Sequence, residues 1–361
     1  MKKKPNYKLR RTIAKISLVV IVLVIIVIIN WTSITRIPIY IQYSNKYSYV
    51  KTLFEVGYSN DEVKTTIEEF DKKKVFDKIN EDYIIELHNK GYKNKTINFI
   101  LINFTKLEIT KLLNKKYNQD LEAFLDVDLF NFEHYQRYVE YKEDYPDLTV
   151  DQVVTRVELD LDKRPYETPE EEKNPNSVTA LVNKHRYISK EYVPTDLVEM
   201  SDEYANNAYG VKEIRSETYE QFKKMVDDAR KEGITFLAES GYRDYDYQET
   251  LYRDYVNEYG EAKANEFAAR AGFSEHQLGT TLDLSNIWTI EEGDKEYKWI
   301  DENGYKYGFI FRYKSKFEDI TGYKAEGWHI RYVGVDAATT IHKKGISFDE
   351  YWLKYVKNNS K

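Results

Sequence analysis

Two separated stretches hold the residues that could carry chemistry. His276 and Asp283 lie in the first stretch, and Glu326 and His329 lie in the second. Two imidazoles and one carboxylate match the set that a catalytic zinc ion takes from a protein, with a fourth position left for water. A further carboxylate that is not a ligand can accept a proton from that water. The chain has only six histidines, so this grouping predicts a hydrolytic metal site, with an ordinary polar pair as the alternative.

The spacing of the first stretch predicts a loop followed by a strand. Six residues separate His276 from Asp283, which is enough for the chain to leave a loop, turn at Gly279 and enter a strand over 281–284. The chain lacks the helical His-Glu-x-x-His pattern of zinc peptidases. We therefore expect the ligands to converge from a loop and from strands.

The second stretch restricts the backbone near Glu326. Because side chains alternate along an extended strand, Glu326 and His329 would point to opposite faces if both lay in one. Both reach a single metal only if the chain bends at Gly327 or if Glu326 precedes the strand. We expect that strand over 329–334, where apolar residues alternate.

The chain contains the pattern Ser-x-His-x-x-Gly-x-x-x-Asp at 274–283 and then Glu-x-Trp-His at 326–329. Together these two motifs resemble those of the VanY-type D-alanyl-D-alanine carboxypeptidases. This group includes related L,D-carboxypeptidases of bacterial cell walls. Other stretches agree with the family in the same order along the chain. They are Ser-Gly-Tyr-Arg at 240–243, Tyr-Gln at 247–248, Leu-Tyr at 251–252, the Lys-Tyr-Gly-Phe run at 306–313 and Ile-Thr-Gly-Tyr at 320–323. The resemblance covers roughly Val178 to Ala338, under half of the chain.

The resemblance implies a role for each of the main site residues. His276, Asp283 and His329 would bind Zn²⁺, Glu326 would act as the general base and Arg243 would stabilise the oxyanion. The implied reaction is hydrolysis of the last peptide bond of a substrate, with Glu326 taking the proton of the attacking water and passing it to the leaving amine.

The implied substrate is a peptidoglycan stem peptide that ends in D-alanine. Cleavage of the pentapeptide, a D,D reaction, is our first expectation, and L,D cleavage of the tetrapeptide is the alternative. A non-catalytic, zinc-containing protein that binds the cell wall is a third interpretation, which the intact Glu326 disfavours. We expect Ser274, Tyr242 and Gln248 to contact the substrate, although Ser274 is equally a candidate turn former or helix cap.

Three positions depart from the family's pattern. Thr281 stands where a small residue is usual, Gly327 stands where proline is common, and Asn303-Gly304-Tyr305 lacks the histidine that often precedes the Lys-Tyr-Gly-Phe run. None of these changes removes a ligand. They affect the shape of the substrate pocket and hence its specificity.

The elements that must position these residues form a domain over 178–361. A helix should start at Ser216 and end at Gly233, and a strand over 234–238 should deliver the 240–243 stretch. Helices follow over 246–259 and 261–271, and a closing helix begins near Asp349. Because the helices come first and the strands later, we expect an α+β fold with an antiparallel sheet and flanking helices.

The N-terminus predicts membrane topology. Residues 1–12 are basic and should stay in the cytoplasm, while 13–34 are apolar and long enough to span about 30 Å of hydrocarbon. The chain from Arg36 onward would then lie outside the cell. A cleaved signal peptide is the competing interpretation, but no small-x-small cleavage site follows the apolar run. We therefore expect a single-pass anchor in the cell membrane.

Composition excludes several functions. The chain has no cysteine, which rules out disulfides, cysteine-ligated zinc and thiol catalysis. Its net charge is −7, and seven of its 54 basic residues lie within the first 15 positions. The rest of the chain is therefore more acidic still, which argues against nucleic acid as a partner.

A helical region should connect the anchor to the catalytic domain. Over 35–164, a pattern of Leu, Gly, Tyr and three apolar residues that begins at Leu53 recurs from Leu87, 34 residues later. It predicts two similar helical units that serve as a spacer or as a module binding peptidoglycan or protein. The pair Thr149 and Gln152 predicts a capping box. Residues 165–177, rich in proline and glutamate, should be a linker.

Overall fold

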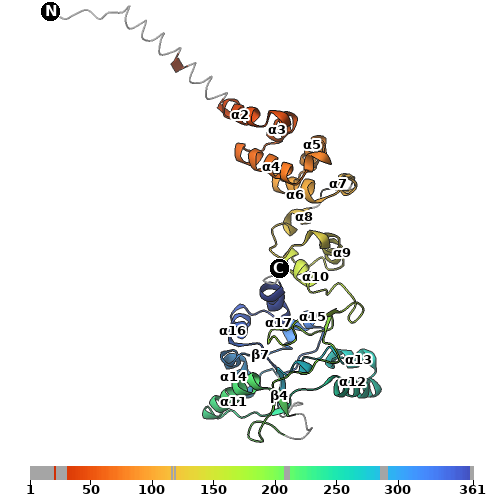
Figure 1. Cartoon of the computed structure of the whole chain (residues 1–361), viewed down its shortest axis with the longest axis vertical. Coiled ribbons are helices and arrows are strands. Elements are labelled where there is room, and N and C mark those ends of the chain that lie inside the picture. Colours follow the sequence, from red (N-terminus) through yellow and green to blue (C-terminus); the bar gives the residue numbers. More distant parts are fainter. Residues whose placement is uncertain are drawn as a thin grey trace, which may run out of the picture. The chain divides into compact units, whose positions relative to one another are not determined.

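The computed structural model describes residues 20–21, 31–114, 117, 119–206, 212–284 and 292–357 of the chain. The chain divides into two compact units, Met1–Phe132 and Glu133–Lys361 (Figure 1). Each unit is described here by itself.

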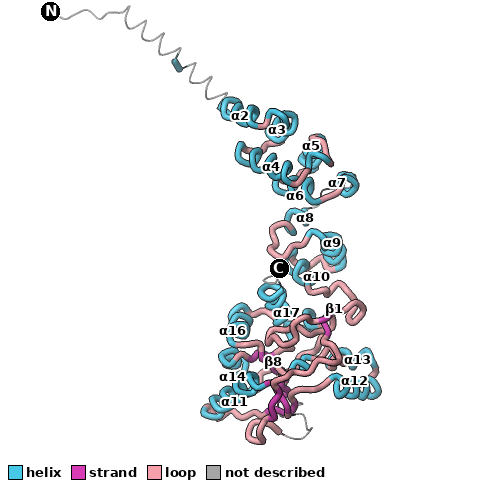
Figure 2. Tube along the Cα trace, viewed as in Figure 1, coloured by secondary structure: helices cyan, strands magenta, loops and turns pink. Residues whose placement is uncertain are grey.

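The described part of the first unit is helical, as the sequence predicts (Figure 2). Amphipathic helices with short turns bury one apolar face each. Their bounds are α2 (Trp31–Gln42), α3 (Tyr47–Glu55), α4 (Asn60–Lys72), α5 (Asp82–Lys90), α6 (Asn94–Asn103), α7 (Lys106–Leu113) and α8 (Gln119–Phe124).

The internal sequence echo corresponds to a structural repeat, in which α3 and α4 form one copy and α5 and α6 form the other. Gly57 and Gly91 follow the first helix of each copy, with left-handed φ angles of 97° and 104°. Tyr58 and Tyr92 then each donate a backbone hydrogen bond to the carbonyl of the leucine five residues earlier, at 3.0 and 3.3 Å. The repeat is therefore a helix–turn–helix unit that uses the same glycine turn twice.

Most of the predicted membrane span over 13–34 lies outside the described residues. Within the described ranges, no helix is both long enough and apolar enough to cross a membrane. The end of the span overlaps α2, which begins at Trp31.

The second unit begins with two helices, α9 (Tyr135–Asp144) and α10 (Val150–Glu158). The predicted capping box is present at the start of α10, where the Thr149 hydroxyl accepts a hydrogen bond from the Gln152 backbone at 3.3 Å. Both helices fall within the compact unit that also contains the sheet.

The stretch over 165–177 packs on this unit, which differs from the predicted linker. Strand β1 (Glu170–Glu171) pairs in parallel with β2 (Arg186–Tyr187). The ring of Tyr166 packs edge-on against that of Phe273, with ring centroids 4.9 Å apart. The residues of this stretch are exposed or half-buried, so tertiary contacts tether a segment whose composition alone resists packing.

The largest sheet of this unit has four strands in the order β5-β6-β8-β7, and all neighbours are antiparallel. Their bounds are β5 (Ala238–Ser240), β6 (Thr281–Leu284), β7 (Phe309–Phe311) and β8 (His329–Tyr332). A separate antiparallel pair is formed by β3 (Leu197–Glu199) and β4 (Glu213–Arg215). This confirms the α+β class with an antiparallel core.

Helices flank the sheet within this unit, with α11 and α14 on one side and α12 and α13 on the other (Figure 1). The bounds are α11 (Ser216–Lys231), α12 (Tyr245–Tyr259), α13 (Glu261–Phe267), α14 (Lys295–Asn303), α15 (Glu318–Thr321), α16 (Val335–Lys344) and α17 (Phe348–Tyr351). The strand predicted at 234–238 was placed too early. The Ile234 backbone N–H still bonds back to the Ala229 carbonyl at 3.0 Å as the helix ends, so the strand starts at Ala238.

The two faces of the sheet differ in character because side chains alternate along each strand. Leu282 and Leu284 of β6 and Ile330 and Tyr332 of β8 point into the apolar core, together with α11 and α14. The intervening side chains lie on the opposite face. That face therefore carries the polar and charged residues, and we call it the site face.

Candidate metal centre and active site

The centre of the site is a pair of residues on neighbouring strands. Asp283 of β6 and His329 of β8 are direct partners in the antiparallel register. Directly opposed residues of such a pair project to the same face with side chains in contact range. The Asp283 Oδ1 atom consequently lies 3.4 Å from Nδ1 of His329.

His276 reaches the same point from the turn that precedes β6. A 3₁₀ helix (Glu275–Leu278) follows Ser274, whose hydroxyl accepts a hydrogen bond from the His276 backbone at 3.3 Å. Gly279 then adopts a left-handed φ of 65°, and a Cβ there would lie only 2.9 Å from the Arg215 side chain. The predicted turn at Gly279 is confirmed, because both the backbone angle and the available space require glycine.

The loop after β5 fixes the orientation of the His276 ring. Its Nδ1 atom donates a hydrogen bond to the Gly241 carbonyl at 2.7 Å, since a carbonyl can only accept. Gly241 itself is tightly enclosed, because a Cβ there would lie 2.3 Å from the Glu213 carbonyl oxygen. With Nδ1 protonated, Nε2 carries the free lone pair, and it lies 3.3 Å from Asp283 Oδ2.

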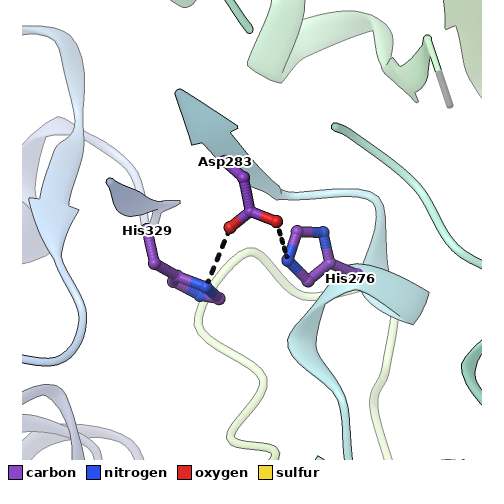
Figure 3. Close-up of side chains that lie close together, drawn as sticks. All are labelled: His276, Asp283 and His329. Atoms are coloured by element: carbon purple, nitrogen blue, oxygen red, sulfur yellow. Dashed lines mark ion pairs between the residues drawn. The ribbon is translucent and has the colours of Figure 1, made fainter. Parts of the chain in front are cut away.

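His276, Asp283 and His329 thus form one cluster (Figure 3). Each offers one ligand atom, and these atoms all lie within 4.8 Å of one another. All three residues are buried. Two imidazoles and a carboxylate from a loop and two strands fit the three-ligand set of a catalytic zinc site. The structure brings the predicted ligands together, and their metal-binding role stays a prediction.

Glu326 lies beside this cluster and precedes β8, and the chain also turns at Gly327, so both backbone alternatives hold. Its backbone N–H donates to the Tyr313 carbonyl at 2.9 Å, and its Oε2 atom lies 3.4 Å from Nδ1 of His329. Burial, followed by the nearby charge of Asp283, raises the pKa of Glu326 to about 8. A buried carboxylate with a pKa near neutrality can both accept and release a proton.

The charged groups around the cluster shift one another's pKa. Burial opposes charge on Asp283, but His276 and Arg243 outweigh it and hold the pKa of Asp283 well below its usual range. Burial, followed by the charge of Arg243, lowers the pKa of His276. Burial also lowers the pKa of His329, but neighbouring carboxylates, Asp283 first, outweigh it and raise the pKa to about 9.

Arg243 lies against the cluster, as the sequence predicts. Its Nη2 atom donates to Asp283 Oδ2, and its Nε atom donates to the Ser240 hydroxyl at 3.0 Å. The backbone N–H of Arg243 donates to the His276 carbonyl at 3.3 Å. The guanidinium group is therefore fixed at the edge of the proposed metal site, where it can stabilise negative charge.

These residues line a cavity of about 420 Å³ on the site face. Tyr247, Gln248, Leu251 and Tyr255 of α12 form one wall, and aromatic residues from other segments contribute to the rest. Pockets of this kind bind small ligands through apolar walls and a few placed polar groups. The cavity is of a size that suits the end of a peptide.

The three predicted substrate-binding residues have different positions. Ser274 and Gln248 line the cavity, whereas Tyr242 does not. Gln248 donates to the Ala269 carbonyl at 2.8 Å, and its Oε1 atom is buried without a hydrogen-bond partner among the described residues. Ser274 is a helix cap, one of its predicted alternatives.

Sequence reasoning missed a buried charged network beneath the site. Glu275 lies between Arg312 and Arg331, and Arg312 also contacts Asp349. The sequence of β8 could have indicated this network. Arg331 follows His329 at the two-residue spacing that places both side chains on the site face. A charged residue between apolar strand neighbours, here Ile330 and Tyr332, predicts a buried partner.

The chain is similar to known proteins over the part that holds these residues. Residues 211–335 match the family model described as VanY, D-alanyl-D-alanine carboxypeptidase. The chain is 41% identical over 191 residues to the putative carboxypeptidase YodJ of Bacillus subtilis (strain 168), covering 51% of this chain and 70% of that protein. It is 39% identical over 184 residues to a D-alanyl-D-alanine carboxypeptidase of Enterococcus faecium, covering 49% of this chain and 57% of that protein.

Among solved structures, the LdcB LD-carboxypeptidase is 38% identical, with a TM-score of 0.49, and the match covers 53% of this chain and 92% of that chain. The stretch matched by the family model contains Arg243, His276, Asp283, Glu326 and His329. The similarity therefore falls on the residues that line the cavity.

Proposed function

The chain belongs to the VanY family of D-alanyl-D-alanine carboxypeptidases, and we propose that it removes the C-terminal D-alanine from peptidoglycan stem peptides. It is an enzyme of the metallopeptidase class that this family represents. One observation carries the proposal: three buried ligand side chains, a buried carboxylate and an arginine converge on a single cavity.

His276, Asp283 and His329 would hold a zinc ion in this site. His276 supports this best, because its Nδ1 hydrogen bond to Gly241 leaves Nε2 free to bind. When bound, zinc supplies Lewis-acid chemistry, which polarises a peptide carbonyl and makes water more acidic.

Glu326 moves the proton in the proposed reaction. It takes one proton from the attacking water, the carbon–oxygen bond forms, and Glu326 returns that proton to the amine as the carbon–nitrogen bond breaks. Arg243 stabilises the negative charge that develops on the carbonyl oxygen. Its anchor to Ser240 at 3.0 Å fixes its direction before substrate binds.

The cavity supports a peptide end as the substrate, and the description of the family supports a D,D reaction. The test uses defined muropeptides incubated with the zinc-loaded protein, with products identified by mass spectrometry. We expect the pentapeptide to lose one D-alanine, with no reaction after the metal is removed by a chelator. Cleavage of the tetrapeptide alone would assign L,D specificity, and the absence of any product would overturn the proposed function.

We further propose that residues 13–34 anchor the protein in the cell membrane, with the chain from Arg36 onward outside the cell. The basic residues before the apolar run support this orientation. The exposed apolar side chains of Ile34, Ile37 and Ile41 on α2 also suit a helix close to a lipid surface.

Protease added to intact protoplasts tests this orientation. It should digest the chain beyond Arg36, while a cytoplasmic marker protein stays intact until the cells are lysed. Protection of the chain in intact protoplasts would show that the orientation is wrong.

A further inference from the structure

Both imidazoles of the proposed metal site turn one ring nitrogen towards Asp283, but His276 uses Nε2 and His329 uses Nδ1. His276 turns Nε2 towards Asp283, at 3.3 Å, and its other nitrogen donates to the Gly241 carbonyl. His329 turns Nδ1 towards Asp283, at 3.4 Å. Which ring nitrogen binds a metal depends on the hydrogen bond made by the other one. The Nε2 atom of His329 therefore needs a partner.

Glu275 occupies that position. Its Oε2 atom lies 3.5 Å from His329 Nε2, an ion-pair contact that is longer than the roughly 2.7–3.2 Å of a formed hydrogen bond. Both atoms are buried, and within the described residues neither has a hydrogen-bond partner. Each is therefore available to the other. The side chain of Glu275 is fully buried, so water does not compete for its carboxylate.

The other oxygen of Glu275 is held by two arginines. Its Oε1 atom lies 2.8 Å from Arg312 Nε and 3.0 Å from Arg331 Nη1. Arg331 is itself fixed by hydrogen bonds from Nη2 to the carbonyls of Val178 and Ala180, both at 3.0 Å. With Oε1 held in this way, Oε2 is the atom that faces the imidazole.

The network continues away from the site. Arg312 donates to Asp349 at 2.6 Å, and Asp349 accepts a hydrogen bond from the Asn183 amide at 2.9 Å. Two arginines thus face two carboxylates in the interior, which balances the formal charges. Only one of these carboxylates, Glu275, approaches a proposed metal ligand.

We propose that Glu275 is a positioning residue, whose carboxylate holds the His329 ring with Nε2 protonated and Nδ1 directed at the metal. This inference rests on the proposed function. The competing role is purely structural, in which Glu275 only neutralises Arg312 and Arg331. Carboxylate partners of metal-bound histidines fix the ring and its tautomer, and losing one costs about 10–100-fold in metal affinity.

The test compares zinc affinity in the full-length protein, measured by competition with a chelator. Glu275→Gln keeps the shape but removes the charge, and Glu275→Asp keeps the charge but withdraws it from His329. We expect both to raise the zinc dissociation constant by about 10–100-fold. Asp349→Asn is the matched control, because it removes the other carboxylate of the network without touching His329. It should lower thermal stability and change the zinc dissociation constant by less than about 3-fold.

A second measurement follows the tautomer directly. Nitrogen NMR shifts of the zinc-loaded wild type should show His329 protonated at Nε2, and Glu275→Gln should change this signal while leaving that of His276 in place. If Glu275→Gln does not fold, Glu275→Asp still provides both measurements. The inference, but not the proposed function, is overturned if both Glu275 variants bind zinc with wild-type affinity. The same holds if Asp349→Asn loses as much zinc affinity as the Glu275 variants do. A wild-type protein that takes up no zinc would overturn the proposed function with it.

Discussion

Asp283 and His329 face each other directly across the β6–β8 pair, and their side chains meet on the face of the sheet that is turned away from the apolar core. A shift of one residue in this register would turn one of them into the core. The hydrophobic side chains that alternate with them, Leu282 and Ile330, fix the register because they must stay buried. The packing of the core therefore sets the geometry of the proposed metal site.

Glu326→Gln should separate proton transfer from metal binding. The substitution keeps the size of the side chain beside His329 but removes its basicity, so we expect kcat to fall by about 10²–10⁴-fold. Zinc content, measured by elemental analysis, should stay at the wild-type level. Loss of zinc would make Glu326 a ligand, and near-normal turnover would assign the base to another carboxylate.

Each of the three proposed ligands should be needed for zinc. His276→Ala, Asp283→Ala and His329→Ala each remove one ligand atom from a buried cluster, so bound zinc should fall in each variant while circular dichroism shows an intact fold. His342→Ala is the matched control, because His342 is exposed and stacks on Tyr305 away from the cluster. Full zinc occupancy in any one of the three would remove that residue from the set.

The boundary of the catalytic unit should lie at Glu133. A fragment that begins there keeps Tyr166 and β1, whereas a fragment that begins at Ser177 loses the Tyr166–Phe273 contact and the β1–β2 pair. Removing a fully buried aromatic side chain costs about 3–5 kcal/mol, and because Tyr166 is half-buried the loss should lie near the lower end of this range. At roughly 2–4 °C for each kcal/mol in a unit of this size, the shorter fragment should unfold about 10 °C lower. Equal unfolding temperatures in calorimetry would show that 165–177 is a linker after all.

Lys184 should make stability depend on pH. Its ammonium group donates to the Asn265 carbonyl at 2.6 Å and to the Gly322 carbonyl, and it lies over the Tyr323 ring at 4.2 Å. Burial, followed by the charge of Arg270, lowers its pKa to about 8.

Between about pH 8 and 10 the unfolded chain therefore binds more protons at Lys184 than the folded chain does, so the free energy of unfolding rises with pH. The contribution is at most about 1.4 kcal/mol per pH unit. Urea unfolding of the wild type and of Lys184→Met over this range measures the difference in slope. Parallel pH profiles would show that the Lys184 amine titrates as it does in water.

The sequence by itself determined what depends on neighbouring residues along the chain. The capping box at Thr149 and the turn at Gly279 are local patterns, and the structure contains both of them. The types and order of the site residues could also be predicted from the sequence, because His276, Asp283, Glu326 and His329 stand in short motifs.

Only the tertiary structure decided how these stretches meet. The pairing of Asp283 with His329, the approach of Glu275 to Arg312 and Arg331, and the packing of Tyr166 join segments that lie far apart in the chain. Composition and periodicity describe the secondary-structure propensity of one segment at a time. Register and long-range contacts depend on the burial of many side chains together. No single stretch of sequence therefore determines them.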